Sequence, residues 1–134
     1  MNGGDNTMNF EEWKDIPGYE GLYQVSNTGK IKGLPRVTVQ NQILQERILI
    51  PGVINSGYLQ ITLHKNGEHK NFLVHRLVAN AFIPNPKNLQ EVNHKDEDKT
   101  NCNADNLEWC TRKYNLNYGT RNQRSAESRR KKVQ

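Results

Sequence analysis

The sequence is poor in apolar residues and has no long apolar segment. Apolar side chains make up 34% of the 134 residues, which is below the usual share for a globular domain and predicts a small core. No run approaches the roughly 20 apolar residues that a membrane-spanning helix needs, and residues 1–10 lack the apolar centre of a signal peptide. We therefore expect an intracellular protein that does not contact membranes.

Cysteine is also scarce. The two cysteines, Cys102 and Cys110, belong to no C-x-x-C pair. A structural zinc site is excluded because it needs four Cys or His ligands in recognisable pairs. A disulfide-stapled scaffold is not expected in an intracellular protein.

Positive charge is concentrated toward the C-terminal end of the chain. The net charge is +5, and residues 112–134 carry eight Lys or Arg against one acidic residue, whereas residues 1–111 carry eleven basic and thirteen acidic residues. A basic tail of this kind favours a polyanionic partner such as nucleic acid, although charge alone also fits a solvated tail that aids solubility. The candidate phosphate-contacting residues are Arg112, Arg121, Arg124, Arg129, Arg130, Lys131 and Lys132.

Short apolar segments separated by turn signals predict a β-rich module over residues 13–73, preceded by a flexible leader at residues 1–12. Residues 23–25 and 30–31 are predicted to pair across the turn at Asn27-Thr28-Gly29. Residues 33–45 are polar and irregular, and we expect them to form a loop or an extended crossing segment.

A hairpin and a helix are predicted next. Residues 58–64 alternate between apolar and polar side chains, Asn66-Gly67 is the preferred pair for a tight primed turn, and residues 71–74 supply a return strand. Apolar residues then recur at helical spacing from Val74 to Phe82, and Pro84 is expected to end that helix. His75, at the start of the helix, is interpreted as structural or phosphate-contacting.

Residues 91–119 are predicted to form a strand, a loop, a strand and a helix. The expected bounds are a strand at residues 91–94, a polar loop at 95–105, a strand at 107–110 and a helix from Arg112. The Thr111 hydroxyl is placed to accept a hydrogen bond from a free backbone N–H at the start of the helix. Gly119 is placed to end the helix in a left-handed conformation.

This segment contains Asn93-His94, Asn106 and Asn115. A hairpin followed by a helix can bring its first strand against the helix, so Asn93, His94 and Asn115 could converge on one point. An imidazole, with an unperturbed pKa near 6.5, suits the base that deprotonates water in phosphodiester hydrolysis. A divalent ion, which accepts amide oxygens as ligands, would supply positive charge at the phosphate. Each asparagine taken alone is more commonly a turn residue.

The same segment resembles the HNH homing-endonuclease family, which has a ββα-metal site. The resemblance is carried by Val92-Asn93-His94-Lys95-Asp96, Asn106-Leu107-Glu108-Trp109-Cys110-Thr111 and Asn115. Residues 74–84 resemble the lead-in segment of phage and intron enzymes of this family. Residues 13–26 resemble the modular N-terminal domain that often precedes the nuclease.

The resemblance implies an α+β protein made of the β-rich module at residues 13–73, a ββα-metal nuclease unit at residues 74–119 and a basic tail at residues 120–134. That tail is expected to contact DNA or to be a truncated linker. The implied activity is metal-dependent hydrolysis of a DNA phosphodiester bond. It is expected to nick the DNA and to leave a 5′-phosphate and a 3′-hydroxyl. The implied cofactor is one Mg²⁺ or Mn²⁺ ion per site, and the implied partner is double-stranded DNA. The expected protein is a monomer or weak dimer, encoded by a phage or mobile element and acting in the bacterial cytoplasm.

The resemblance also assigns roles to single residues. His94 matches the general base, Asn93 and Asn115 match the two metal ligands, and Asn106 matches the asparagine that braces the loop by hydrogen bonds and so orients the histidine. Many relatives have Asp or His where this chain has Asn93, and a neutral amide does not balance the charge of the ion. This departure keeps open a DNA-binding module of the same fold that does not cleave. An RNA-binding or interaction protein with a basic tail is a second alternative.

Overall fold

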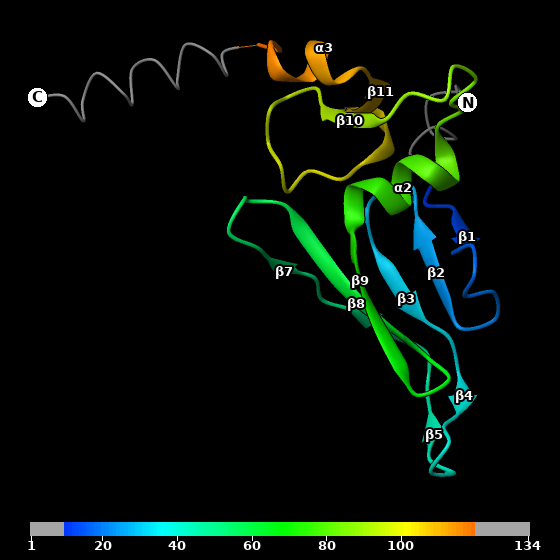
Figure 1. The fold of residues 1–134 in the computed structure, drawn as a ribbon. Helices are drawn as coiled ribbons and strands as arrows, with labels where there is room; N and C mark the ends of the chain where they lie inside the picture. Colours follow the sequence, from blue (N-terminus) through cyan, green and yellow to red (C-terminus); the bar gives the residue numbers. More distant parts are fainter. Residues whose placement is uncertain (1–9, 120–134) are drawn as a thin grey trace, which may run out of the picture.

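The computed structural model describes residues 10–119, and their N-terminal half consists of short antiparallel strands (Figure 1). One sheet has the strand order β1-β2-β3-β6, with β1 (Trp13–Asp15), β2 (Tyr23–Ser26), β3 (Ile31–Gly33) and β6 (Arg47–Leu49). The predicted pairing across Asn27-Thr28-Gly29 is confirmed, because Val25 pairs with Ile31. Gly29 has a φ of 97°, a conformation that favours glycine.

Residues 33–45 contain more structure than expected. Two short strands, β4 (Arg36–Val37) and β5 (Ile43–Leu44), pair with each other and form a separate two-stranded sheet. The turn between them is closed by Thr38. Its backbone N–H donates to the backbone carbonyl of Gln42, and its hydroxyl accepts from the backbone N–H groups of Gln40 and Gln42. These local hydrogen bonds explain how a polar segment without clear alternation forms a hairpin.

The predicted central hairpin is confirmed with a longer return strand. β7 (Gly52–Val53), β8 (Leu59–Lys65) and β9 (Glu68–Leu73) form a three-stranded sheet in that order. Asn66 and Gly67 both have positive φ, as a primed two-residue turn requires. Because Lys65 pairs with Glu68 directly across this turn, β9 begins three residues before the predicted start.

Helix α2 (Val74–Phe82) follows β9 as predicted and ends before Pro84. The remaining described chain forms β10 (Glu91–His94), a short 3₁₀ helix (Ala104–Asn106), β11 (Leu107–Cys110) and α3 (Arg112–Leu116). α3 ends earlier than expected, because the Asn117 N–H bonds to the carbonyls of Lys113 and Tyr114 and tightens the last turn. Gly119 has a φ of 58° but lies beyond the helix.

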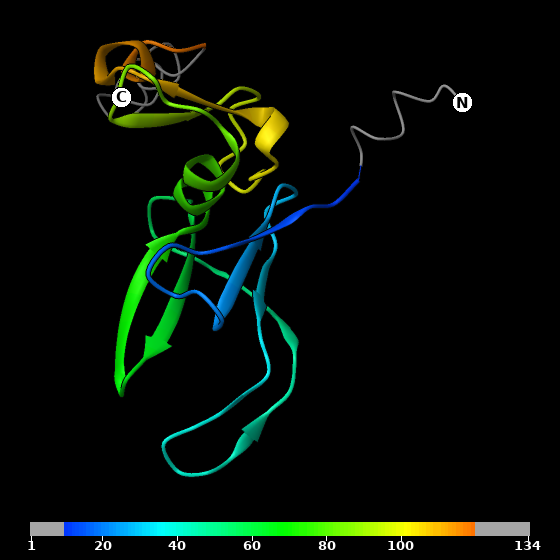
Figure 2. The same cartoon turned by 90° about the vertical axis from the view of Figure 1, so that its right-hand side faces the viewer.

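The core is continuous from the sheets to the β10–β11 hairpin. Its buried side chains include Val25 of β2, Leu63 of β8, Val78 of α2, Val92 of β10 and Leu107 of β11. Figures 1 and 2 show α2 lying between the sheets and the β10–β11–α3 unit. The hairpin is therefore held against α2 by apolar packing, so the protein has the predicted α+β architecture.

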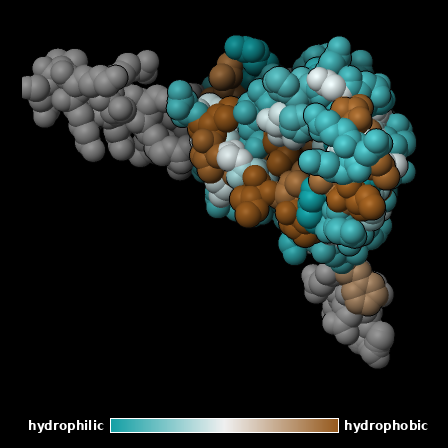
Figure 3. All heavy atoms as spheres, turned by 90° about the horizontal axis from the view of Figure 1, so that it is seen from below, coloured by the Kyte–Doolittle hydropathy of each residue, from teal (hydrophilic) through white to brown (hydrophobic). Residues whose placement is uncertain are grey.

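Several apolar side chains stay exposed at the other end of the molecule, which Figure 3 views from below. They belong to the segments around β4, β5, β6 and β7 and are Val37, Val39, Ile43, Ile48, Ile50 and Val53. Within residues 10–119 neither α2 nor α3 combines the length and the apolar content that crossing a bilayer would require.

Candidate active site

The two faces of the β10–β11 hairpin carry different groups. Successive strand residues point to opposite faces, and the register pairs Asn93 with Glu108 and His94 with Leu107. The face of Asn93 and Glu108 is covered by α3, and the face of His94 and Leu107 is covered by α2. Figure 1 shows the hairpin between these two helices, so the predicted site residues divide between two sides of the same strand.

Asn93 is almost fully buried, with 1% of its surface exposed. Its Nδ2 donates to Glu108 Oε2 over 2.7 Å. Its Oδ1 is buried and has no hydrogen-bond partner among the described residues. A buried acceptor in this state has a free-energy cost that a bound donor or cation would remove, so the environment of this atom fits a ligand of a hard divalent ion.

Asn115 reaches the same face from α3. It is buried, and its Nδ2 donates to Glu91 Oε1 over 3.2 Å. The helix that carries it is capped as predicted, because Thr111 Oγ1 accepts from the Tyr114 N–H over 3.1 Å. Since Glu91 lies two residues before Asn93 on β10, the structure brings the two predicted amide ligands to one side of the hairpin.

His94 lies on the other side, at the end of β10. The centre of its ring lies 4.8 Å from the ring centre of His75 on α2 and 5.7 Å from that of Tyr58. The ring centres of Tyr58 and His75 are 4.9 Å apart, so the three rings form one cluster. His94 is 5% exposed. Since His94 is the last residue of β10 and adjoins the 95–106 loop, the expectation that Asn93, His94 and Asn115 meet at a single point stays a prediction.

His75 is a buried partner of His94. Burial, followed by the nearby His94 and Arg76, lowers the pKa of His75 to about 3. Its Nδ1 has no hydrogen-bond partner in the described part of the chain. A neutral, buried ring in this position packs against His94 and fits the structural interpretation of His75 better than a cationic phosphate contact.

Asn106 closes the loop that follows His94. Its Nδ2 donates to Asp96 Oδ1 over 2.9 Å and to the Asn101 carbonyl over 3.0 Å, and its Oδ1 accepts from the Asp96 N–H over 3.0 Å. Its backbone carbonyl accepts from the Lys95 N–H. These bonds fix the chain immediately after His94. Hydrogen bonds from Asn101 and other loop groups also lower the pKa of Asp96, so this carboxylate is engaged within the loop.

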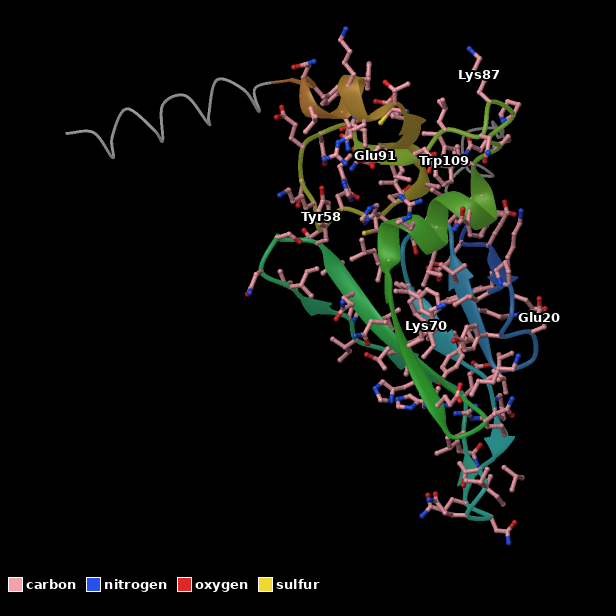
Figure 4. All side chains as sticks on the ribbon, viewed as in Figure 1. Glu20, Tyr58, Lys70, Lys87, Glu91 and Trp109 are labelled. Atoms are coloured by element: carbon pink, nitrogen blue, oxygen red, sulfur yellow. The ribbon has the colours of Figure 1, made fainter. Side chains whose placement is uncertain are left out.

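Sequence reasoning missed the carboxylates and the aromatic group around these residues. Figure 4 labels Glu91, the first residue of β10, near α3, and Tyr58, which lies below the 95–106 loop. Lys99 of that loop donates to the Ser56 carbonyl over 2.8 Å, and its Nζ lies 4.9 Å from the centre of the Tyr58 ring. The spacing of Glu91 and Asn93 was a usable signal, because residues two apart on a strand share a face.

Of the predicted DNA-contacting residues, only Arg112 is described, and it is exposed on α3. The other six lie outside the described residues: Arg121, Arg124, Arg129, Arg130, Lys131 and Lys132.

Two families match successive parts of the chain. Residues 11–64 match the NUMOD4 motif, and residues 72–117 match the HNH endonuclease family. The chain is 43% identical over 106 residues to DNA endonuclease I-HmuI of Bacillus phage SP01, a match that covers 78% of this chain and 55% of that protein. It is 31% identical over 102 residues to H-N-H endonuclease F-TflII of Escherichia phage T5, covering 75% of this chain and 48% of that protein.

A solved structure also matches. It concerns DNA binding and cleavage by the HNH homing endonuclease I-HmuI, with a TM-score of 0.64 and 38% sequence identity over 91% of this chain and 65% of that chain. The chain spans about half the length of the two phage proteins.

Proposed function

We propose that the protein is a metal-dependent DNA endonuclease, because residues 72–117 match the HNH endonuclease family and follow a NUMOD4 match. The similarity of the chain to the HNH homing endonuclease I-HmuI supports this proposal. The substrate is double-stranded DNA, and the reaction is hydrolysis of one phosphodiester bond. The nick leaves a 5′-phosphate and a 3′-hydroxyl.

The observation that carries this proposal is the buried Oδ1 of Asn93, which has no hydrogen-bond partner among the described residues. Asn93 and Asn115 lie on one face of the hairpin and would hold a Mg²⁺ or Mn²⁺ ion through their amide oxygens. When bound, such an ion supplies positive charge at the phosphate and at the departing 3′ oxygen. The chain contributes the placement of both amides before DNA arrives.

His94 is the proposed general base, which takes the proton from the attacking water at an imidazole nitrogen. The rings of His75 and Tyr58 hold the imidazole in one orientation. Asn106 is the proposed brace, since its hydrogen bonds fix the loop that begins at Lys95.

The proposal also covers the partners and setting of the protein. The basic residues from Arg112 onward would bind DNA phosphates and position the nuclease without reading sequence. The protein would act in the bacterial cytoplasm as a monomer or weak dimer, encoded by a phage or mobile element, and the named phage relatives support this setting. With a single HNH segment in the chain, one protomer would make one nick.

A second candidate is a DNA-binding module of the same fold that does not cleave. The observation that favours it is that the side chains proposed to hold the ion, Asn93 and Asn115, are neutral amides. Amides leave the charge of a divalent ion unbalanced.

A supercoiled-plasmid assay tests the proposal. The full chain is incubated with plasmid and Mg²⁺ or Mn²⁺, with and without a chelator, and nicking is followed under single-turnover conditions. We expect metal-dependent nicking that His94→Ala reduces by about 10² to 10⁴-fold, the usual contribution of a general base. His69→Ala, which removes an exposed histidine of β9, is the matched control and should retain the parent rate.

Two results would contradict the proposal. DNA binding without nicking in either metal would favour the second candidate. Nicking by His94→Ala at the parent rate would show that His94 is not the base.

A further inference from the structure

Each proposed amide ligand is held by a glutamate. Asn93 Nδ2 donates to Glu108 Oε2 over 2.7 Å, and Asn115 Nδ2 donates to Glu91 Oε1 over 3.2 Å. The two amides thus have the same arrangement, with the NH₂ group engaged by a carboxylate. The Oδ1 of Asn93 is left to face the proposed ion.

The fold places both glutamates by register. Glu108 lies directly opposite Asn93 on β11, and Glu91 lies two residues before Asn93 on the same face of β10. α3 crosses this face and contributes Asn115, as well as Tyr114, whose hydroxyl lies 3.2 Å from Glu108 Oε2. Both glutamates are half-buried. Figure 4 shows Glu91 at the hairpin, near α3.

A carboxylate in this position acts on the amide in two ways. It fixes the orientation of the amide, because only the NH₂ group can donate to it. It also polarises the amide and places negative charge near the Oδ1 atom, where partial burial reduces screening by water. Groups that bind metals are commonly held by outer carboxylates of this kind, which raise the basicity of the ligand.

We propose that Glu108 and Glu91 are positioning residues of the metal site and supply the negative charge that a directly ligating carboxylate would otherwise supply. The inference rests on the proposed function, since it concerns the same ion. It explains how a site with two neutral amide ligands can hold a divalent cation: the charge lies one hydrogen bond away from the ion.

Manganese binding by the full chain tests this inference without measuring cleavage. Free Mn²⁺ is quantified by electron paramagnetic resonance during titration of the parent, Glu108→Gln and Glu91→Gln, and circular dichroism verifies that each variant is folded. Glutamine keeps a side-chain oxygen that can accept the amide proton but removes the charge. We expect each variant to bind Mn²⁺ about tenfold more weakly, at the lower end of the usual effect of an outer-sphere partner.

Glu68→Gln is the matched control. It makes the same change of charge at an exposed position at the start of β9, outside the β10–β11 hairpin that carries Asn93. We expect it to bind Mn²⁺ within twofold of the parent. An equal loss of affinity in Glu68→Gln and Glu108→Gln would overturn the inference, because it would show only a general effect of net charge.

A charge swap separates a positioning role from a purely structural one. In the double variant Asn93→Asp/Glu108→Gln, the carboxylate moves to position 93, and the NH₂ group of the new glutamine can donate to it. The total charge equals that of the parent, but the negative charge now lies on the proposed ligand itself. We expect Mn²⁺ affinity to return at least to the parent value. Affinity that stays as low as in Glu108→Gln would contradict the inference.

Asn93→Ala distinguishes failure of this inference from failure of the proposed function. If Asn93→Ala binds Mn²⁺ as well as the parent, the ion is not held at this site and both proposals fail. If Asn93→Ala loses affinity while Glu108→Gln and Glu91→Gln retain it, the metal site stands and only the role of the glutamates is wrong.

Discussion

At the scale of single residues, His75 is the titratable group most altered by the fold among those with a resolved pKa shift. It is 4% exposed, packs against the rings of Tyr58 and His94, and has a pKa lowered to about 3 by burial, His94 and Arg76. It is therefore neutral at working pH. Its contribution is a flat, uncharged aromatic surface beside His94, held on the first turn of α2.

The lowered pKa of His75 predicts how stability depends on pH. Unfolded His75 binds a proton as pH falls through about 6.5, whereas the folded protein resists this proton until about pH 3. The free energy of unfolding should therefore decrease as pH falls below 6.5, by up to about 1.4 kcal/mol per pH unit from this group. Urea unfolding at pH 7, 6 and 5 measures this slope.

His75→Phe provides the comparison, because it keeps a ring but cannot be protonated. We expect the free energy of unfolding of this variant to depend less on pH than that of the parent over the same interval. His69→Phe changes an exposed histidine and should keep the parent slope. Parallel curves for the parent and His75→Phe would show that the buried ring does not titrate as described.

At the scale of secondary structure, α3 has the least intrinsic stability of the elements around the site. It has five residues, and a helix this short does not form in water without tertiary contacts and caps. Its contacts with β10 include the hydrogen bond from Asn115 to Glu91, and its N-terminus is capped by Thr111. The position of Asn115 therefore depends on a cap four residues away.

Thr111→Ala should loosen α3. Loss of the hydrogen bond from the Tyr114 N–H should reduce the free energy of unfolding by about 1 kcal/mol, the usual value of an N-cap. We also expect faster hydrogen exchange at the backbone N–H of Asn115, which donates to the Thr111 carbonyl. Mn²⁺ binding should become weaker. Thr111→Ser keeps the hydroxyl and should behave as the parent. Unchanged exchange in Thr111→Ala would show that packing alone fixes the helix.

The elements that could be predicted from sequence are those with a local signal. The apolar spacing of α2, the Asn66-Gly67 turn and the Thr111 cap each act within a few residues, and the structure confirms them. β4 and β5 have two residues each and depend on hydrogen bonds that the Thr38 hydroxyl accepts from backbone N–H groups. Polar composition alone does not distinguish such a hairpin from a loop. The predicted end of α3 at Gly119 was wrong, because the Asn117 N–H tightens the last turn of the helix before Gly119 is reached.

The candidate site divides in the same way. The two amides on one face could be anticipated, since a hairpin followed by a helix brings its first strand under the helix. The separate face of His94 follows from strand alternation, but its partners Tyr58 and His75 come from other elements. Glu108 became visible only through the register that pairs it with Asn93. Contacts set by register and tertiary packing were beyond the sequence patterns.

At the scale of the whole molecule, the part matched by the NUMOD4 motif and the part matched by the HNH family share one core. They are also joined by polar contacts. The Ala104 N–H donates to the Asn27 carbonyl over 2.7 Å, and Lys14 Nζ donates to the Ala81 carbonyl over 3.1 Å. Tyr58, within the NUMOD4 match, contacts the ring of His94. The proposed base is thus supported by both parts.

A shared core predicts that both parts unfold together. Trp13 reports on β1 and Trp109 on β11, and these are the two tryptophans of the chain. We make Trp13→Phe and Trp109→Phe, so that each protein keeps one reporter. In each variant, urea unfolding followed by fluorescence should coincide with unfolding followed by circular dichroism, as a two-state transition requires.

A core substitution then tests whether the coupling is energetic. Val74 is fully buried where β9 meets α2, and Val74→Ala should lower the free energy of unfolding by about 2 kcal/mol through lost apolar contacts. The shift should be equal in the two single-tryptophan backgrounds. Val39→Ala, at a side chain 83% exposed, should shift neither by more than about 0.5 kcal/mol. The opposite result would be an unchanged urea midpoint in the Trp109 reporter together with a shifted midpoint in the Trp13 reporter. It would mean that the β10–β11 hairpin folds alone and that the position of His94 does not depend on the NUMOD4 part.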